Sequence, residues 1–194
     1  ACSEFMAEHG YESAHELQGH LLRDLQAYLA SKGKKLMGWE EAVHGDKLDH
    51  TATVNAWGGI PIGTELANAG YGVVACAAPF AYLDLAWDEN AFEPGYYWAG
   101  TCDLATCYGY EPTTPELTHD GAHRMIGMQA VLWSELVREP AELEYMLFPR
   151  LLAMAETAWT APSDKDLSNF VARLPFQLTR LELQGVVHRR LDDR

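Results

Sequence analysis

The sequence predicts an α/β fold built around a parallel sheet. Short apolar segments that suit strands alternate with helical patterns, and almost no loop separates the first helix from the first strand. Apolar residues follow one another within the strand candidates without polar alternation, as in "AVLW" at 130–133, which is typical of strands buried on both faces. With 194 residues, the chain is long enough for one domain with a core or for part of a larger domain.

The clearest element is a helix within "SAHELQGHLLRDLQAYLASKGKK", residues 13–35. Ser13 and Glu16 form an S-x-x-E capping box at its start, and Gly33 ends it. Apolar side chains recur at helical spacing on one face: Leu17, Leu21, Leu25 and Tyr28. The segment "KLMGW", residues 35–39, follows directly and predicts a first strand that ends at a tryptophan.

The same alternation continues along the chain. Residues 52–57 predict a second strand, 64–70 a short helix, 71–79 a third strand and 130–133 a fourth. The connection 80–124 is rich in Gly, Pro, Tyr and Trp and has little periodicity. A helical stripe with an expected bend at Pro149 follows: Leu143, Leu147, Leu151, Met154 and Ala158. A last helix is predicted from about Asp166, interrupted at Pro175.

Aromatic and acidic residues gather where the predicted strands end. Trp39, Trp57 and Trp133 stand at strand ends, and three polar residues lie just beyond: Tyr82, Asp84 and Glu135. The carboxyl ends of parallel strands build active sites, so these side chains are expected to face a cleft. Indole rings with scattered carboxylates suit a sugar, which offers C–H faces for stacking and hydroxyls for hydrogen bonds.

Structural roles for the same residues stay open at this point. A single Trp after a strand is more often a packing residue, although three at equivalent positions are harder to explain in that way. Glu135 beside Ser134 could cap the following helix, and Asp84 could be only a turn residue.

Charge and cysteine content narrow the class of protein. A net charge of −14 argues against nucleic acid as a partner and fits a neutral or cationic small ligand, or simply a well-solvated surface. The sequence contains no run of about eighteen apolar residues, so it predicts no membrane span. It does not show a basic start followed by an apolar run, so it predicts no signal peptide. Cys102 and Cys107 could form a disulfide, which would imply an oxidising compartment, whereas Cys76 suits the core. No spacing of Cys and His predicts a zinc site.

Several segments together make the sequence resemble the β-N-acetylhexosaminidases of glycoside hydrolase family twenty. They are "GKKLMGWEEAV", "NAWGG", "AYLDL", "YYWAG", "GMQAVLWSE" and "EYMLFPRLLAMAETAW". The resemblance implies a (β/α)₈ TIM barrel, of which residues 1–194 would be the C-terminal half, as a single partial domain. It implies hydrolysis of terminal, non-reducing, β-linked N-acetylhexosamine residues by substrate-assisted retaining catalysis, in which the substrate's own acetamido group attacks the anomeric carbon.

The resemblance also assigns roles to individual residues. Three tryptophans would enclose the N-acetyl methyl group: Trp39, Trp57 and Trp133. Tyr82 would donate its hydroxyl proton to the acetamido oxygen. Asp84 and Trp98 would lie at the sugar 6-hydroxyl, and Glu135 would accept hydrogen bonds from the 4- and 6-hydroxyls. The expected ligands are glycans that contain N-acetylglucosamine or N-acetylgalactosamine, and no metal or organic cofactor is expected.

One departure from the family pattern is large. The family's catalytic Asp-Glu pair follows His-x-Gly-Gly at the end of the fourth strand, but the only Asp-Glu here is Asp88-Glu89, without that context. By the family's layout, residue 1 would fall shortly downstream of the missing pair, and the Arg expected from the first strand is also absent. The chain alone is therefore expected to be inactive. The missing half of the barrel, or a second copy of this chain, would complete it.

Two alternatives to the enzyme fragment stay open. One is a non-catalytic half-barrel that binds aminosugars, and the other is a half-barrel that self-associates through its open sheet edges. The resemblance favours a periplasmic or extracellular location, but the sequence leaves the compartment undetermined.

Overall fold

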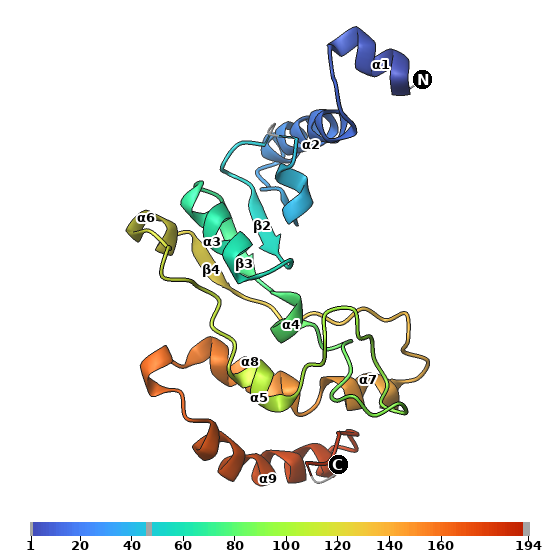
Figure 1. Cartoon of the computed structure of the whole chain (residues 1–194), viewed down its shortest axis with the longest axis vertical. Helices are drawn as coiled ribbons and strands as arrows, with labels where there is room; N and C mark the ends of the chain where they lie inside the picture. The colour runs from blue at the N-terminus through green and yellow to red at the C-terminus, as the bar shows by residue number, and fades with distance from the viewer. Residues whose placement is uncertain (1, 46–47, 192–194) are drawn as a thin grey trace. The chain divides into compact units, whose positions relative to one another are not determined.

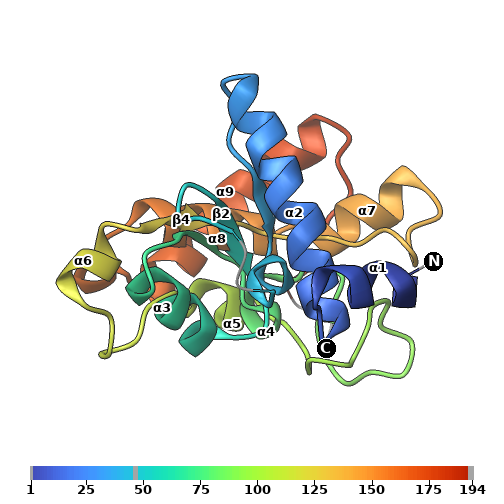
Figure 2. The same ribbon diagram turned by 90° about the horizontal axis from the view of Figure 1, so that it is seen from above.

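The computed structural model describes residues 2–45 and 48–191, which divide into two compact units (Figures 1 and 2). Unit 1 comprises residues 1–75 and 113–127, and unit 2 comprises residues 76–112 and 128–194. Unit 1 holds the sheet, and unit 2 holds the long loop after the third strand and the C-terminal helices.

Four strands form the sheet in the order β1-β2-β3-β4. They are β1 Met37–Trp39, β2 Thr53–Ala56, β3 Gly72–Ala75 and β4 Met125–Met128, the last residue of which belongs to unit 2. β1 pairs with β2 and β2 with β3 in parallel register, with Trp39 level with Asn55 and Ala56 level with Ala75. The predicted parallel α/β architecture is confirmed.

The other elements of unit 1 are helical. They are α1 Cys2–His9, α2 Ala14–Ser31, the 3-10 helix η1 Glu40–Val43, α3 Ile60–Asn68 and α6 His119–Ala122. α3 packs against β2, β3 and α6 (Figures 1 and 2). It begins four residues earlier than predicted, because Pro61 suits the first turn of a helix.

The capping box of α2 is confirmed, but the predicted apolar stripe is not the face that packs. Glu16 N–H donates to Ser13 Oγ, and the Glu16 carboxylate accepts from Ser13 N–H. Leu21 is 67% exposed, whereas Gly19 and Gln26 are buried on another face of the helix. The close approach to this face requires a glycine at position 45, because a Cβ on Gly45 would lie 2.7 Å from Gly19 Cα.

The remaining elements belong to unit 2. They are α4 Ala78–Ala81, α5 Leu104–Tyr108, α7 Pro140–Leu147, α8 Arg150–Trp159, the 3-10 helix η2 Pro162–Asp164 and α9 Leu167–Leu183. α5 packs against α8 (Figure 1). The chain bends at Pro149, as expected, and this bend separates α7 from α8. The peptide bond between Phe148 and Pro149 is cis.

Two predicted boundaries are wrong. Pro175 does not interrupt α9, because it lies on the exposed side, where water can satisfy the carbonyl that loses its donor. The fourth strand is 125–128, not 130–133, and only Val131 of the predicted segment is buried. β4 is the last strand in the order of the described sheet. The apolar segment 130–133 follows this edge strand and is therefore not enclosed by strands on both sides.

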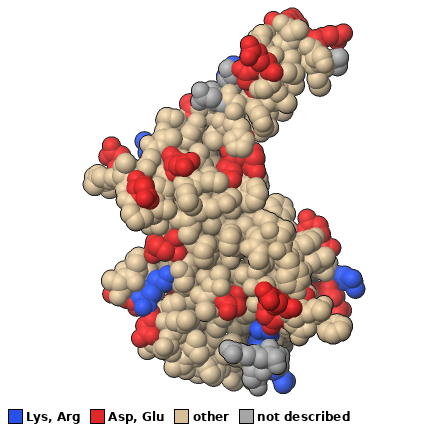
Figure 3. All heavy atoms as spheres, viewed as in Figure 1, with Lys and Arg blue, Asp and Glu red and all other residues tan. Residues whose placement is uncertain are grey.

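The described part of the chain contains no helix long and apolar enough to cross a membrane. Figure 3 shows Asp and Glu side chains spread over both units on the visible face, with fewer Lys and Arg, in keeping with the net charge of −14.

Candidate carbohydrate-binding site

In unit 2, a single parallel bridge brings the loop after β3 beside the segment after β4. Tyr82 is level with Val131, Leu83 N–H donates to Val131 O at 2.6 Å, and Val131 N–H donates to Ala81 O at 2.8 Å. Residues 83 and 84 then form a turn, which Leu85 N–H closes by donating to Tyr82 O at 3.3 Å. Of the strand predicted at 130–133, the structure has one isolated bridge, at Val131.

This bridge assembles four of the predicted site residues. The backbone N–H of Trp133 lies close to the Asp84 carboxylate, and the Tyr82 and Trp98 rings meet edge to face with centroids 5.8 Å apart. Tyr82 is buried, whereas Trp98 and Trp133 are about half exposed. The result is an aromatic surface with a buried hydroxyl-bearing ring beside a carboxylate, which is a surface suited to a sugar.

Asp84 is the most unusual of these residues. It is 1% exposed, and its Oδ1 atom has no hydrogen-bond partner among the described residues. Burial raises the pKa of its carboxyl group above the ordinary value, and the nearby Glu135 charge acts in the same direction. Glu135 itself is exposed. A buried acceptor without a partner is a natural hydrogen-bonding position for a ligand hydroxyl.

A buried arginine holds the segment that carries these residues. Arg150 in α8 is fully buried, and its guanidinium donates to the carbonyl oxygens of Leu83, Leu85 and Cys102. It also donates to Met146 O and stacks 4.3 Å from the centre of the Trp87 ring. Sequence reasoning missed this residue; its place in the "FPRLL" segment that carries the resemblance was the available signal.

In unit 1, Trp39 and Trp57 lie at the ends of β1 and β2, as predicted, and both are half-buried. Glu40 and Glu41 position Trp57. The Trp57 backbone N–H donates to Glu40 Oε2 at 2.8 Å, and its indole N–H donates to Glu41 Oε1 at 2.9 Å. Gly58 N–H also donates to Glu40, whose side chain leaves no room for a Cβ at that position. Sequence reasoning had assigned these two glutamates no role.

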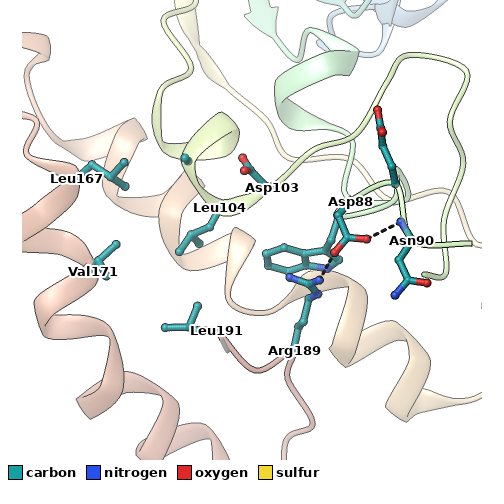
Figure 4. A pocket seen from close by; sticks show the side chains of 11 residues that line it. Asp88, Asn90, Asp103, Leu104, Leu167, Val171, Arg189 and Leu191 are labelled. Carbon is teal, nitrogen blue, oxygen red and sulfur yellow. Dashed lines mark hydrogen bonds and ion pairs between the residues drawn. The ribbon is translucent and has the colours of Figure 1, made fainter. Parts of the chain in front are cut away.

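Unit 2 also contains a cavity of about 620 Å³ that none of the seven predicted residues lines (Figure 4). Arg189 reaches across its edge and pairs with Asp88 at 2.6 Å, while Leu167 and Val171 of α9 form an apolar side. Glu89 lines it too. The chain's one adjacent Asp-Glu pair thus lies at this cavity, with Asp88 held in an ion pair.

The described side chains include no group of three or more His, Cys, Asp or Glu residues placed to hold a metal ion.

Comparison with known proteins places the chain in a family. Residues 1–162 match the sequence model of the family described as "Glycosyl hydrolase family 20, catalytic domain". The chain belongs to glycosyl hydrolase family 20. Its resemblance to β-N-acetylhexosaminidases is thereby confirmed.

Relatives in family 20 are glycosidases. A β-hexosaminidase from Vibrio furnissii is 43% identical over 155 residues, which are 79% of this chain and 25% of that protein. A β-hexosaminidase from Porphyromonas gingivalis is 33% identical over 186 residues, covering 95% of this chain and 24% of that protein. The chain therefore spans about a quarter of these relatives' length.

Solved structures of family 20 enzymes share the fold. An exo-β-N-acetylglucosaminidase from Vibrio harveyi in complex with N-acetylglucosamine has a TM-score of 0.90 and 38% identity, over 97% of this chain and 30% of that one. A mutant β-hexosaminidase from Streptomyces plicatus in complex with its product has a TM-score of 0.78 and 28% identity, over 90% of this chain and 36% of that one. The family 20 fold described here is thus part of a (β/α)₈ barrel.

Proposed function

We propose that this chain forms the sugar-binding wall of a β-N-acetylhexosaminidase, which removes terminal β-linked N-acetylhexosamine residues by substrate-assisted retaining catalysis. The observation that carries the proposal is the assembly of Tyr82, Asp84, Trp98 and Trp133 around one strand bridge. The names of the relatives support the substrate class, since they are β-hexosaminidases or are solved with N-acetylglucosamine.

Tyr82 acts on the acetamido group. Its ring is buried beside Trp98, so its hydroxyl proton is donated to the acetamido oxygen from a largely apolar surrounding, where the hydrogen bond strengthens as charge develops. Trp133 covers the methyl group of the same acetamide, and enclosure of that group by Trp39 and Trp57 of unit 1 stays a prediction from the family resemblance. Confinement converts the attack on the anomeric carbon into an intramolecular step, an effect that lowers a barrier by roughly 7–11 kcal/mol when the geometry is right.

The carboxylates recognise the sugar hydroxyls. Asp84 accepts from the 6-hydroxyl, beside Trp98, through the oxygen that lacks a partner among the described residues. Glu135, which is exposed, accepts from the 4- and 6-hydroxyls. Both contacts keep the sugar in register for the attack, and neither residue transfers a proton.

Proton transfer to the leaving group requires an acid that this chain does not supply. Asp88 is paired with Arg189, and the sequence lacks the Gly-Gly-Asp-Glu context of the family's catalytic pair. General acid–base catalysis contributes about 10²–10⁴-fold. The chain is therefore proposed to bind the sugar, and to require the Asp-Glu partner residues for turnover.

The test is a calorimetric titration of the chain with an N-acetylglucosamine thiazoline, which mimics the cyclised intermediate. Tyr82→Phe removes one hydrogen bond to a group that bears charge, an effect of about 1.5–3 kcal/mol or a roughly 10–100-fold weaker Kd. Trp133→Ala should weaken binding by a similar factor. Trp159→Ala, at a 92% exposed position of the same unit, is the matched control and should bind normally.

A folded chain that does not bind the thiazoline, with folding checked by circular dichroism, would overturn the proposal for this chain. Equal loss of affinity in the Trp159→Ala control would show that the effect is not specific to the site.

A further inference from the structure

Two buried thiols lie in contact in unit 2. The sulfur atoms of Cys102 and Cys107 are 3.2 Å apart, and both residues are fully buried. Neither forms a disulfide in the structure. Cys102 is anchored by its backbone, because its N–H donates to Ala86 O at 2.8 Å and its carbonyl oxygen accepts from Arg150.

The start of α5 explains why these thiols meet. Asp103 is the N-cap, and its side chain accepts from Thr106 N–H at 2.7 Å. Cys102 is the residue before the cap, and Cys107 is the fourth residue of the helix. These two positions are the ones that pack together in a hydrophobic staple. The capping turn therefore places the two sulfurs side by side.

The surroundings of the pair distinguish its two sulfurs. The hydrogen bond from Cys107 lowers the pKa of the Cys102 thiol, and the nearby Arg150 guanidinium acts in the same direction. The same hydrogen bond and burial raise the pKa of the Cys107 thiol. We assign Cys102 as the nucleophile, because the Arg150 guanidinium that donates to its carbonyl oxygen also stabilises its thiolate, and Cys107 is the partner thiol.

We propose that Cys102 and Cys107 form a site of oxidative modification, at which hydrogen peroxide converts the thiol pair to an intrachain disulfide. The Cys102 thiolate attacks one peroxide oxygen and the O–O bond breaks, which leaves a sulfenic acid at Cys102. The hydroxide released takes up the proton that Cys102 gave up and forms water.

The second step closes the bridge. The Cys107 sulfur attacks the Cys102 sulfur, the S–O bond breaks, and the departing hydroxide takes the Cys107 proton as a second water. The two thiols lose two electrons in total, and the peroxide gains them. Because both sulfurs are buried, a small uncharged oxidant that enters through local opening is the fitting reagent, and the adjacent thiol intercepts the sulfenic acid before further oxidation.

The bridge would tie the loop segment that ends at Cys102 to α5. That segment includes Ala86 and Trp98, and Arg150 already holds it through carbonyl oxygens. Oxidation is therefore expected to raise the midpoint temperature of unfolding, and dithiothreitol should reverse the rise.

The test treats the folded 194-residue chain with hydrogen peroxide, removes the excess with catalase, and alkylates the remaining thiols under denaturing conditions. Proteolysis on the N-terminal side of Asp103 separates the two cysteines, so a disulfide appears as a linked pair of peptides. The expected result is a Cys102–Cys107 link, with the loss of two hydrogen atoms and two alkylation sites. This measurement needs no variant and no glycosidase activity, so its failure is distinct from failure of the proposed function.

Variants assign the two roles. Cys107→Ser, in a Cys2→Ser background that removes the exposed thiol, should accumulate a sulfenic acid at Cys102 that dimedone traps. Cys76→Ala in the same background is the control, and should form the Cys102–Cys107 link as the unmodified chain does. The proposal is overturned if Cys102 and Cys107 both remain alkylatable after Cys2 is fully oxidised. A link to Cys76, or a sulfinic acid at Cys102 in the unmodified chain, would equally contradict it.

Discussion

Asp84 combines burial with a carboxylate oxygen that no described residue satisfies. Such an arrangement is unfavourable for stability alone, because desolvation disfavours the charged form. It is favourable where a ligand hydroxyl completes the hydrogen bond on binding. The position therefore bears the signature of a binding residue that reduces the stability of the free protein.

The pH dependence of stability tests this interpretation. Because burial raises the pKa of Asp84 in the folded chain, its contribution to stability is fullest below the unfolded pKa and is lost as pH rises through the folded pKa. Asp84→Asn cannot ionise, so it should raise the midpoint of thermal unfolding at neutral pH. The gain should vanish as pH falls to about 4, near the ordinary pKa of Asp.

The matched control is Asp166→Asn, at the N-cap of α9, where Asn caps a helix as well as Asp does. Thermal denaturation followed by circular dichroism at several pH values compares the two. An Asp84→Asn variant that is less stable than the unmodified chain at neutral pH would contradict the interpretation.

At the scale of elements, the loop after β3 owes its shape to α8. Arg150 donates to carbonyl oxygens of Leu83, Leu85 and Cys102, which are distant from it in sequence but come together around its guanidinium. Burial lowers the pKa of this guanidinium, although the group stays charged in a protein. The helix thus fixes the backbone on both sides of Asp84.

Replacement of Arg150 should expose how much the loop depends on it. Arg150→Met keeps much of the side-chain volume but leaves several buried carbonyl oxygens without a donor, at about 1–3 kcal/mol each. We expect a loss of about 3 kcal/mol or more in the free energy of unfolding, measured by urea denaturation. Arg150→Lys keeps a charge and up to three donors, and should be affected less.

Arg173→Met is the control for removal of an arginine from a helix of the same unit. Its side chain is 54% exposed and pairs with Glu156 at the surface of the unit, so less stability should be lost than at position 150. Equal effects at positions 150 and 173 would contradict the role given to Arg150.

At the scale of the whole molecule, the chain holds part of a family 20 catalytic domain and lacks the Gly-Gly-Asp-Glu context. We expect the purified 194-residue chain to show no measurable hydrolysis of a chromogenic N-acetylglucosaminide. A full-length β-hexosaminidase from Vibrio furnissii, assayed beside it, is the positive control. If the chain hydrolyses this substrate and Tyr82→Phe abolishes the hydrolysis, the chain's own residues suffice for proton transfer.

Local pattern was enough for the elements whose cause is local. The capping box at Ser13, the end of α2 near Gly33 and the break at Pro149 follow from the chemistry of a few adjacent residues, and each was predicted. Family motifs led to Tyr82, Asp84 and Trp133, which the strand bridge then brought together. The grouping of all three tryptophans around one acetamide stays a prediction.

By itself, the sequence determined the alternating parallel α/β architecture, the family and the candidate sugar-binding residues. Only the tertiary structure decided which face of α2 packs, since Leu22 and Leu29 of that helix lie against the core and Gly19 lies against Gly45. It also decided that β4 precedes the apolar segment 130–133, that Glu40 and Glu41 hold Trp57, and that Arg150 holds the loop around Asp84. The physical reason is the same in each case: hydrophobic periodicity reports what a segment can bury, whereas close packing and buried hydrogen bonds depend on partners distant in the chain.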